Sequence, residues 1–226
     1  MTTNGVRLAA KPVHEGGTPA ERWLAWNHDF PELALEDCAN LIVVSAHAVD
    51  AIFGLGATLA MLGEHAQVVC ATDALDDQRP ELTQACLALG IAPPIFLALP
   101  DGQLAWHARD LGEHLVPLLD GDDWLAAPWR GDGDPDHAAA GEAALWAAQK
   151  ADCVYVEYPV WMWHWAEPDD PDVPWTDTAR IVTPVEAWSK KRIAVAQFES
   201  QIRGDQPALP PPVVRRALML PEAVFV

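Results

Sequence analysis

The sequence predicts an α/β domain with a mainly parallel sheet, and three observations lead to this prediction. Short apolar runs recur along the chain, as is typical of strands that are buried on both faces. Segments of helical length separate these runs, which is the pattern of βαβ units. The chain has 226 residues, 50% of them hydrophobic, so it is long enough to form one domain with a substantial core.

The first half of the chain supplies three expected strands. Residues 1–39 carry few periodic signals and are expected to be an N-terminal extension. Buried strands are expected at residues 41–46, 67–72 and 94–99. Helices are expected at residues 20–26, 52–63 and 81–89. Gly63 and Gly90 end two of these helices, because glycine readily adopts the left-handed conformation that closes a helix. A polar loop is expected at residues 73–80.

The second half continues the alternation. Strands are expected at residues 124–129 and 153–158, and the triplet Ile-Val-Thr occupies 181–183. Helices are expected at residues 108–119, 137–151 and 184–202. The segment 203–226 is rich in proline, and its residues 207–212 are expected to be a stiff surface segment or the approach to a strand.

Charge and composition exclude several kinds of partner. The net charge of −19 argues against nucleic acid and anionic membranes, which the chain would repel. A neutral or cationic small molecule fits this charge, and so does an acidic surface that is merely solvated. No apolar run approaches the ~18 residues of a membrane helix. The first residues lack the build of a signal peptide, so a cytoplasmic protein is expected. The four cysteines show no CxxC spacing, and disulfides are not expected.

Two polar motifs follow expected strands. His47 and Asp50 stand three residues apart at a helix start, which places both side chains on one face about one turn apart. Asp134-Pro-Asp-His137 occupies another loop between a strand and a helix. Because ligands of a parallel sheet bind beyond the carboxyl ends of its strands, the two motifs should meet at one rim. Two histidines and one carboxylate form a common catalytic set for zinc or iron(II). Taken alone, the first pair is more often explained by a helix cap or a surface histidine.

The motifs resemble those of a known family. Ser-Ala-His47-x-x-Asp50, with two glycines following, resembles the Ala-His-Pro-Asp-Asp-Glu motif of the PIG-L/LmbE-like deacetylases. Asp134-Pro-Asp-His137 resembles that family's second motif, His-Pro-Asp-His, and the resemblance covers residues 40–202. It implies a Rossmann-like three-layer fold and zinc-dependent removal of N-acetyl groups from amino sugars or related compounds. It also implies that His47, Asp50 and His137 are the zinc ligands.

The first motif departs from the family at the catalytic position. Val49 stands where the family has its general base, and alanines replace the neighbouring proline and acid. Asp134 stands where the second motif has a histidine. A positioned base typically contributes ~10²–10⁴-fold to the rate, and valine cannot accept a proton. Asp134 is the best remaining candidate for this role, although its charge would repel a developing oxyanion.

Three interpretations therefore remain open. The chain could keep the fold and the metal without deacetylase activity. It could be a hydrolase in which Asp134 has taken over as base. It could also have lost the metal and serve as a binding or scaffolding protein on the same fold. Loss of the base at position 49 predicts weak or absent deacetylase activity.

A loop with an unusual number of tryptophans supplies further candidates. Aromatic rings stack well on the apolar faces of sugars, so this loop could contact an N-acetylated sugar conjugate. The residues expected to bind substrate are Trp161, Trp163, His164, Trp165 and Asp73. The same rings could instead pack the loop onto the domain or form a contact between identical subunits. No GxGxxG sequence follows the first strand, which disfavours a nucleotide cofactor.

Overall fold

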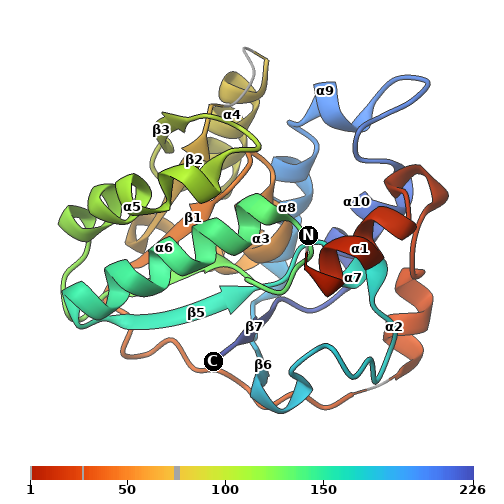
Figure 1. Cartoon of the computed structure of the whole chain (residues 1–226), viewed down its shortest axis with the longest axis horizontal. Helices are drawn as coiled ribbons and strands as arrows, with labels where there is room; N and C mark the ends of the chain where they lie inside the picture. The colour runs from red at the N-terminus through yellow and green to blue at the C-terminus, as the bar shows by residue number, and fades with distance from the viewer. Residues whose placement is uncertain (1, 27, 74–76) are drawn as a thin grey trace.

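The computed structural model describes residues 2–26, 28–73 and 77–226, and it has the expected α/β architecture (Figure 1). The predicted loop at 73–80 includes residues 74–76, which lie outside the described residues. The strands are β1 (Leu41–Ser45), β2 (Ala66–Thr72), β3 (Ile95–Leu99), β4 (Trp124–Pro128), β5 (Val154–Tyr158), β6 (Thr178–Arg180) and β7 (Ala223–Phe225). The helices are α1 (Thr3–Ala10), α2 (Ala20–Trp26), α3 (Asp50–Leu62), α4 (Gln78–Leu89), α5 (Leu104–Leu115), α6 (Pro135–Ala151), α7 (Met162–Trp165), α8 (Val185–Val195), α9 (Glu199–Ile202) and α10 (Pro211–Met219).

The seven strands form one sheet in the order β3-β2-β1-β4-β5-β7-β6. The first five are parallel to one another, and β7 runs antiparallel to both of its neighbours. The strand order reverses between β1 and β4, because the chain leaves β1 toward one edge and returns at β4 to build the other. This reversal is where open α/β sheets bind their ligands.

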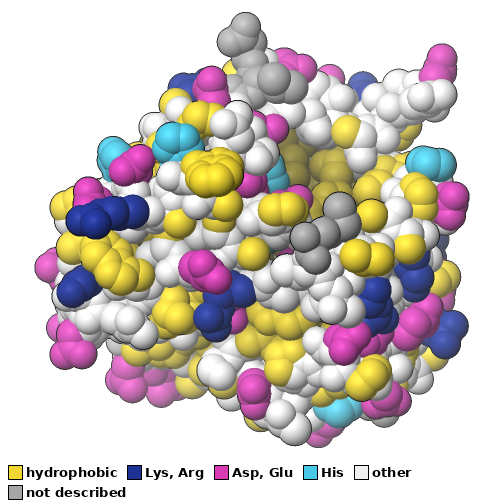
Figure 2. Space-filling view, viewed as in Figure 1, with side chains coloured by type: hydrophobic (Ala, Val, Ile, Leu, Met, Phe, Trp, Pro, Cys, Tyr) yellow, Lys and Arg dark blue, Asp and Glu magenta, His cyan; other side chains and the backbone are white. Residues whose placement is uncertain are grey.

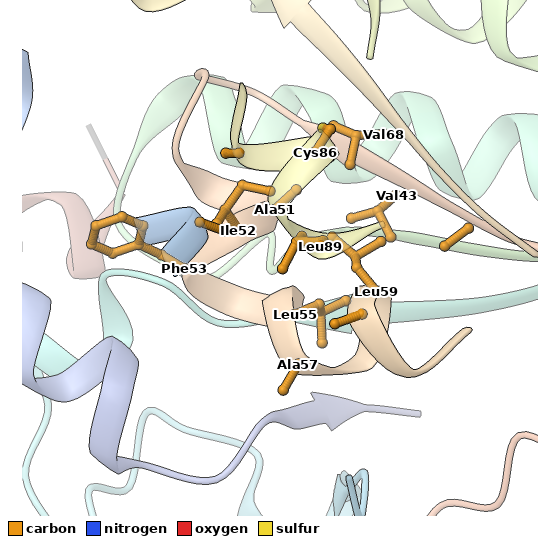
Figure 3. Packing of buried hydrophobic residues seen from close by; sticks show 14 of the residues in the cluster. Val43, Ala51, Ile52, Phe53, Leu55, Ala57, Leu59, Val68, Cys86 and Leu89 are labelled. Atoms are coloured by element: carbon orange, nitrogen blue, oxygen red, sulfur yellow. The ribbon is translucent and has the colours of Figure 1, made fainter. Parts of the chain in front are cut away.

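Helices cover both faces of the sheet. Alternate residues of β1 point to opposite sides, so Leu41 and Val43 pack with α3 and α8, while Ile42 and Val44 pack with α5 and α6. All five residues of this strand are buried, which explains why it appears in the sequence as an unbroken apolar run. Figure 3 shows the first of these cores, with Val43, Leu59 and Leu89 among its labelled side chains.

The two ends of the chain are more structured than the sequence indicated. The expected helix at 184–202 is two helices, α8 and α9, because the chain turns inward between them to bury Phe198 completely. The proline-rich segment contains α10, whose prolines occupy its first turn, where their missing N–H costs nothing. It then adds β7 to the sheet. None of the helices in the described part of the chain is both long and apolar enough to cross a membrane.

Helix α3, which follows the first motif, is broken at Leu55, where the backbone leaves the helical region. The break frees backbone groups on both sides, and a buried ion pair satisfies them. The carboxylate of Glu222 accepts hydrogen bonds from the N–H groups of Ala57 and Thr58, each at 2.7 Å. The ammonium of Lys191 donates to the carbonyl of Phe53 at 2.8 Å and to Glu222 at 2.7 Å.

Close approach explains the two glycines in this helix. A Cβ on Gly54 would lie 2.4 Å from Cδ2 of Tyr158, and one on Gly56 would lie 2.9 Å from Cγ of Lys191. Tyr158 is fully buried, and its hydroxyl donates to the carbonyl of Val44 at 2.6 Å. Its ring therefore cannot move away from an added side chain.

Replacing Gly54 with Ala is expected to destabilise the protein by about 1–3 kcal/mol, because overpacking a rigid core forces neighbouring groups to shift. Urea denaturation would measure the change in the free energy of unfolding. Gly121→Ala is the matched control, because a Cβ there would meet its nearest atoms only at 3.9 Å. Equal stability of the two variants would show that the Tyr158 ring yields.

Candidate metal centre

The two sequence motifs meet at the point where the strand order reverses. His47 lies in the turn after β1, and Asp134 and His137 lie in the loop after β4 and at the start of α6. The hydroxyl of Ser45 fixes the first turn by donating to the carbonyl of His47 at 2.5 Å and accepting from the N–H of Ala51 at 3.1 Å. A carboxylate oxygen of Asp50 accepts the backbone N–H of His47 at 2.6 Å.

One carboxylate oxygen lies between the two imidazole rings. Oδ2 of Asp50 is 3.4 Å from Nδ1 of His47 and 3.3 Å from Nε2 of His137. The ring centroids of the two histidines are 5.6 Å apart. The structure thus brings together the three side chains that the sequence predicts as metal ligands. Their role as ligands stays a prediction.

His137 supplies the strongest indication of an ion. The side chain is completely buried, yet its Nε2 has no hydrogen-bond partner among the described residues. Asp50 lies within ion-pair distance of this nitrogen, but the two groups are not aligned for a hydrogen bond. A buried nitrogen without a partner is costly unless something accepts its lone pair, and a metal ion does so.

Asp132 fixes the orientation of this ring, and the sequence reasoning missed it. Its Oδ2 is 2.8 Å from Nδ1 of His137, so Nδ1 carries the proton and Nε2 is left free. The same carboxylate accepts the backbone N–H groups of residues 160, 161 and 162. The available signal was an acid five residues before the histidine, in the same loop.

Asp134 also reaches the cluster. Its Oδ1 accepts the N–H groups of Asp136 and His137 at 2.8 and 3.3 Å, which makes it the N-cap of α6. A carboxylate oxygen of Asp134 lies within 4.8 Å of donor atoms of both His47 and His137. The cap therefore holds a carboxylate beside the two imidazoles.

Two more acids surround the other side of His47. Its Nε2 is 3.2 Å from Oδ1 of Asp101 and 3.6 Å from Oδ2 of Asp136. Asp136 is held in place by the N–H groups of Gly102 and Leu104, at the start of α5. Because Asp101 is exposed and Asp136 is buried, this second group spans from the surface to the interior.

The accumulated carboxylates stabilise positive charge at this site. Burial alone would lower the pKa of His47, but hydrogen bonds to Asp136 and Asp50 outweigh it and raise this pKa to about 11. Burial likewise opposes the charge on His137, but Asp50 and Asp132 raise the pKa of that ring to about 10. The carboxylates therefore favour positive charge at this site, carried either by protons on the two rings or by a bound cation that displaces the proton from Nε2 of His137.

The position at which the resemblance predicts a general base is apolar and enclosed. Val49 is 9% exposed and forms part of the hydrophobic core with Ala48 and Ala51. No group of Val49, Ala48 or Ala51 can accept a proton. Asp134, on the other loop, places a carboxylate oxygen within 4.8 Å of donor atoms of both histidines.

The tryptophan loop packs mainly against the protein itself. Trp165 is fully buried, and its indole N–H donates to the carbonyl of Asp132 at 2.8 Å. Trp163 packs edge-on against Trp23 at 5.1 Å between ring centroids. The half-buried Trp161 shares a small hollow with Phe53. Of the tryptophans predicted to bind substrate, Trp161 and Trp165 both bond to Asp132, and Trp161 does so through its backbone N–H to the carboxylate.

His164 and Asp73 lie outside the cluster. His164 is 1% exposed and both of its ring nitrogens are hydrogen-bonded, Nε2 to the carbonyl of Lys11 and Nδ1 to the guanidinium of Arg216. Asp73 follows β2 and pairs with Arg79 at 3.1 Å. Neither side chain shares an ion pair or hydrogen bond with the described residues of the centre.

The network around His164 predicts a pH dependence of stability. Since a guanidinium can only donate, Nδ1 must accept and the ring is neutral. Burial, together with the charges of Arg216 and Lys11, lowers the pKa of His164 below its usual 6.5. Between 6.5, the usual pKa that applies in the unfolded chain, and the lower pKa in the folded protein, only the unfolded chain binds the extra proton. Stability therefore falls as the pH is lowered through this range.

His164→Gln, which can still donate and accept, is expected to reduce that slope by up to about 1.4 kcal/mol per pH unit. Urea denaturation between pH 7.5 and 5 would measure it in both proteins. The seven other histidines are the same in both proteins and cancel from the difference. Parallel stability curves would mean that His164 is protonated in the folded protein.

Comparisons with known proteins agree with this architecture. The family model described as PIG-L: GlcNAc-PI de-N-acetylase matches residues 42–148. N,N'-diacetylchitobiose deacetylase from Pyrococcus horikoshii is 18% identical, with a TM-score of 0.60, over 80% of this chain and 77% of that one. A zinc-inhibited form of teicoplanin deacetylase Orf2 is 16% identical, with a TM-score of 0.60, over 82% of this chain and 97% of that one.

A third solved structure is the conserved protein TT1542 from Thermus thermophilus. It is 24% identical, with a TM-score of 0.55, over 72% of this chain and 80% of that one. A search of curated protein sequences found no match. At these identities the structural similarity establishes a shared fold.

Proposed function

This chain carries a PIG-L domain over residues 42–148, and on that premise we propose that it is a metal-dependent amide hydrolase with slow turnover. The substrates are small N-acetylated compounds of the amino-sugar type, the class to which the N,N'-diacetylchitobiose named for one of the similar structures belongs. The observation that carries the proposal is the buried Nε2 of His137, which has no partner among the described residues and faces Asp50.

The donor set fits zinc. His47, Asp50 and His137 would hold the ion, because two imidazoles and a carboxylate are a common catalytic set that leaves a position open. Asp132 holds the ring of His137 in the tautomer that coordination requires. A zinc ion held there supplies Lewis acidity toward a carbonyl oxygen.

The protein's own residues would then move the proton. Asp134 is fixed by its capping bonds and lies beside both histidines, so it can take a proton from water and pass it to the departing nitrogen. The negative charge of Asp134 also attracts the ammonium product. The same charge opposes a developing oxyanion, where the family's histidine would stabilise it, and this predicts the slow turnover.

A second candidate function is non-catalytic binding on the same fold. It is favoured by one observation, the enclosed apolar surface that Val49 and its neighbours form at the position of the family's base. In this alternative the metal and the pocket retain a ligand without hydrolysing it.

Zinc content and acetate release test the two proposals together. We expect about one zinc per chain, retained in Asp134→Asn and lost in His137→Ala. We expect acetate release from N-acetylglucosamine conjugates, with kcat lowered about 10²-fold in Asp134→Asn. Asp205→Asn, at an exposed position, is the matched control.

Each contrary result has a distinct meaning. Absence of zinc after supplementation would overturn the metal site. Zinc without acetate from any conjugate would favour the binding protein. Undiminished activity of Asp134→Asn would remove Asp134 from the mechanism while leaving the hydrolase in place.

A further inference from the structure

Helix α1 packs against the loop that carries Asp132. In Figure 1 this helix lies beside α7, close to the point where α6 begins. The side-chain amide of Asn4 donates a hydrogen bond to the carbonyl of Gly131 at 2.7 Å. On the other side of the aspartate, a Cβ on Gly133 would lie 3.0 Å from the carbonyl oxygen of Asn4 and 3.1 Å from Cβ of Leu8. The helix therefore contacts the residues immediately before and immediately after Asp132.

A further set of contacts reaches the carbonyl of Asp132 through Trp165. The indole N–H of Trp165 donates to this carbonyl at 2.8 Å. The guanidinium of Arg7 lies over the same indole, 4.5 Å from its ring centroid, and the ammonium of Lys11 donates to the backbone carbonyl of Trp165 at 2.9 Å. Arg7 belongs to α1 and Lys11 directly follows it, so the same helix also holds the tryptophan that binds Asp132.

Charged side chains fasten α1 to the rest of the protein. Arg7 forms ion pairs with Asp170 and Asp172. Figure 2, in the orientation of Figure 1, shows basic and acidic side chains next to one another below this helix. Most of the eight residues of α1 remain exposed or half-buried, so these polar contacts supply much of its attachment.

Glycine stands on both sides of Asp132, and glycine restricts the backbone least. Gly133 has a φ of 97°, in the left-handed region that favours glycine. The N–H groups of residues 160–162 bind the carboxylate of Asp132, whereas α1 restrains the backbone from which this carboxylate extends. The 2.8 Å contact between Asp132 and Nδ1 of His137, which sets the tautomer of the buried ring, therefore depends on α1.

We propose that Asn4 is a positioning residue for the metal centre and acts through Asp132 on His137. The hydrogen bond from Asn4 keeps the carboxylate of Asp132 against Nδ1, and Nε2 then stays where it can bind an ion. The docking of α1 thereby sets how tightly the centre holds zinc. The inference rests on the proposed function, because that function assigns the ion to this centre.

Zinc affinity is the first measurement. Asn4→Leu removes the hydrogen bond and keeps nearly the same size and charge. Its dissociation constant for zinc, from competition with a chromogenic chelator, should rise about tenfold, the lower end of the range for groups that orient a metal ligand. Asn40→Leu is the matched control. The amide of Asn40 also donates one hydrogen bond, to Asp123 at 2.8 Å, but it precedes β1 and lies at the opposite end of the strands. Zinc affinity should be unchanged in this variant, even where its free energy of unfolding falls.

The second measurement needs no zinc. In the zinc-free protein, the proton on Nδ1 of His137 can exchange with solvent only when the buried ring is locally uncovered. Its exchange, followed by NMR, should be at least about threefold faster in Asn4→Leu than in the wild type, because the loop opens more often. The exchange rate in Asn40→Leu should equal that of the wild type.

The outcomes separate this inference from the proposed function. If Asn4→Leu binds zinc as tightly as the wild type, or if Asn40→Leu loses as much affinity, Asn4 has no positioning role. Weaker zinc binding with an unchanged exchange rate would overturn the route through His137. If even the wild type binds no zinc, but the Nδ1 proton exchanges faster in Asn4→Leu alone, α1 positions His137 and the metal site is overturned. Equal exchange rates in a protein that binds no zinc would overturn both.

Discussion

Replacing Val49 with Asp is expected to raise kcat for acetate release by about 10²–10⁴-fold, the usual contribution of a positioned base. Val49 directly precedes α3, so its side chain leaves the same turn that carries His47 and Asp50. A carboxylate there is also favoured by the positive end of the helix dipole. The measurement is acetate release from N-acetylglucosamine conjugates by zinc-loaded protein.

Val49→Asn is the matched control, because it has nearly the same shape and cannot act as a base. If Val49→Asn and Val49→Asp release acetate at equal rates, the missing base at position 49 does not limit the activity of this protein. The double change Ala48→Pro with Val49→Asp tests whether the turn must also be rebuilt. Adding Asp134→Asn to Val49→Asp then shows whether the two carboxylates act separately. If the new carboxylate at position 49 makes Asp134 redundant, removing Asp134 should change kcat only slightly.

Replacing Glu222 with Gln is expected to destabilise the protein by about 3–5 kcal/mol, because it leaves the ammonium of Lys191 buried without a counter-charge. Both side chains are only 1% exposed, so water cannot take over the role of the carboxylate. The free energy of unfolding from urea denaturation is the measurement. Zinc affinity should fall as well, since the same carboxylate completes the helix that begins at Asp50.

The double variant Lys191→Met with Glu222→Gln separates charge from hydrogen bonding. It removes both charges and keeps an oxygen that can accept the N–H groups of Ala57 and Thr58. Most of the lost stability should return, because replacing a buried ion pair as a whole is often close to neutral. If the double variant is as unstable as Glu222→Gln, the stabilisation comes mainly from the hydrogen bonds that the Glu222 carboxylate accepts and not from its charge.

The elements that the sequence predicts well are those whose signal is local. The strand at 41–46 is buried on both faces, so nearly every residue in it is apolar. His47 and Asp50 are three residues apart in the sequence, and the turn that precedes α3 brings them together; the α/β fold, with its mainly parallel sheet, is confirmed. The assignment of His47, Asp50 and His137 as ligands stays a prediction, although the three side chains converge.

The features that the sequence does not reveal depend on distant partners. Asp132 appears as one acid among many until the fold places it against His137 and the loop at 160–162. Trp165 looks like a surface for sugars until the structure encloses it. The proline-rich segment gives no sign of a strand, because β7 has only three residues and its place in the sheet is set by its neighbours.

The break in α3 has a consequence for the order of folding. The two halves of this helix are joined through Glu222, which lies 164 residues from Thr58 along the sequence. Contacts of such high sequence separation form slowly, because a long loop must close before they stabilise anything. The helix that begins at Asp50 therefore reaches its final form late, and the proposed metal centre should be complete only after the sheet's far edge has assembled.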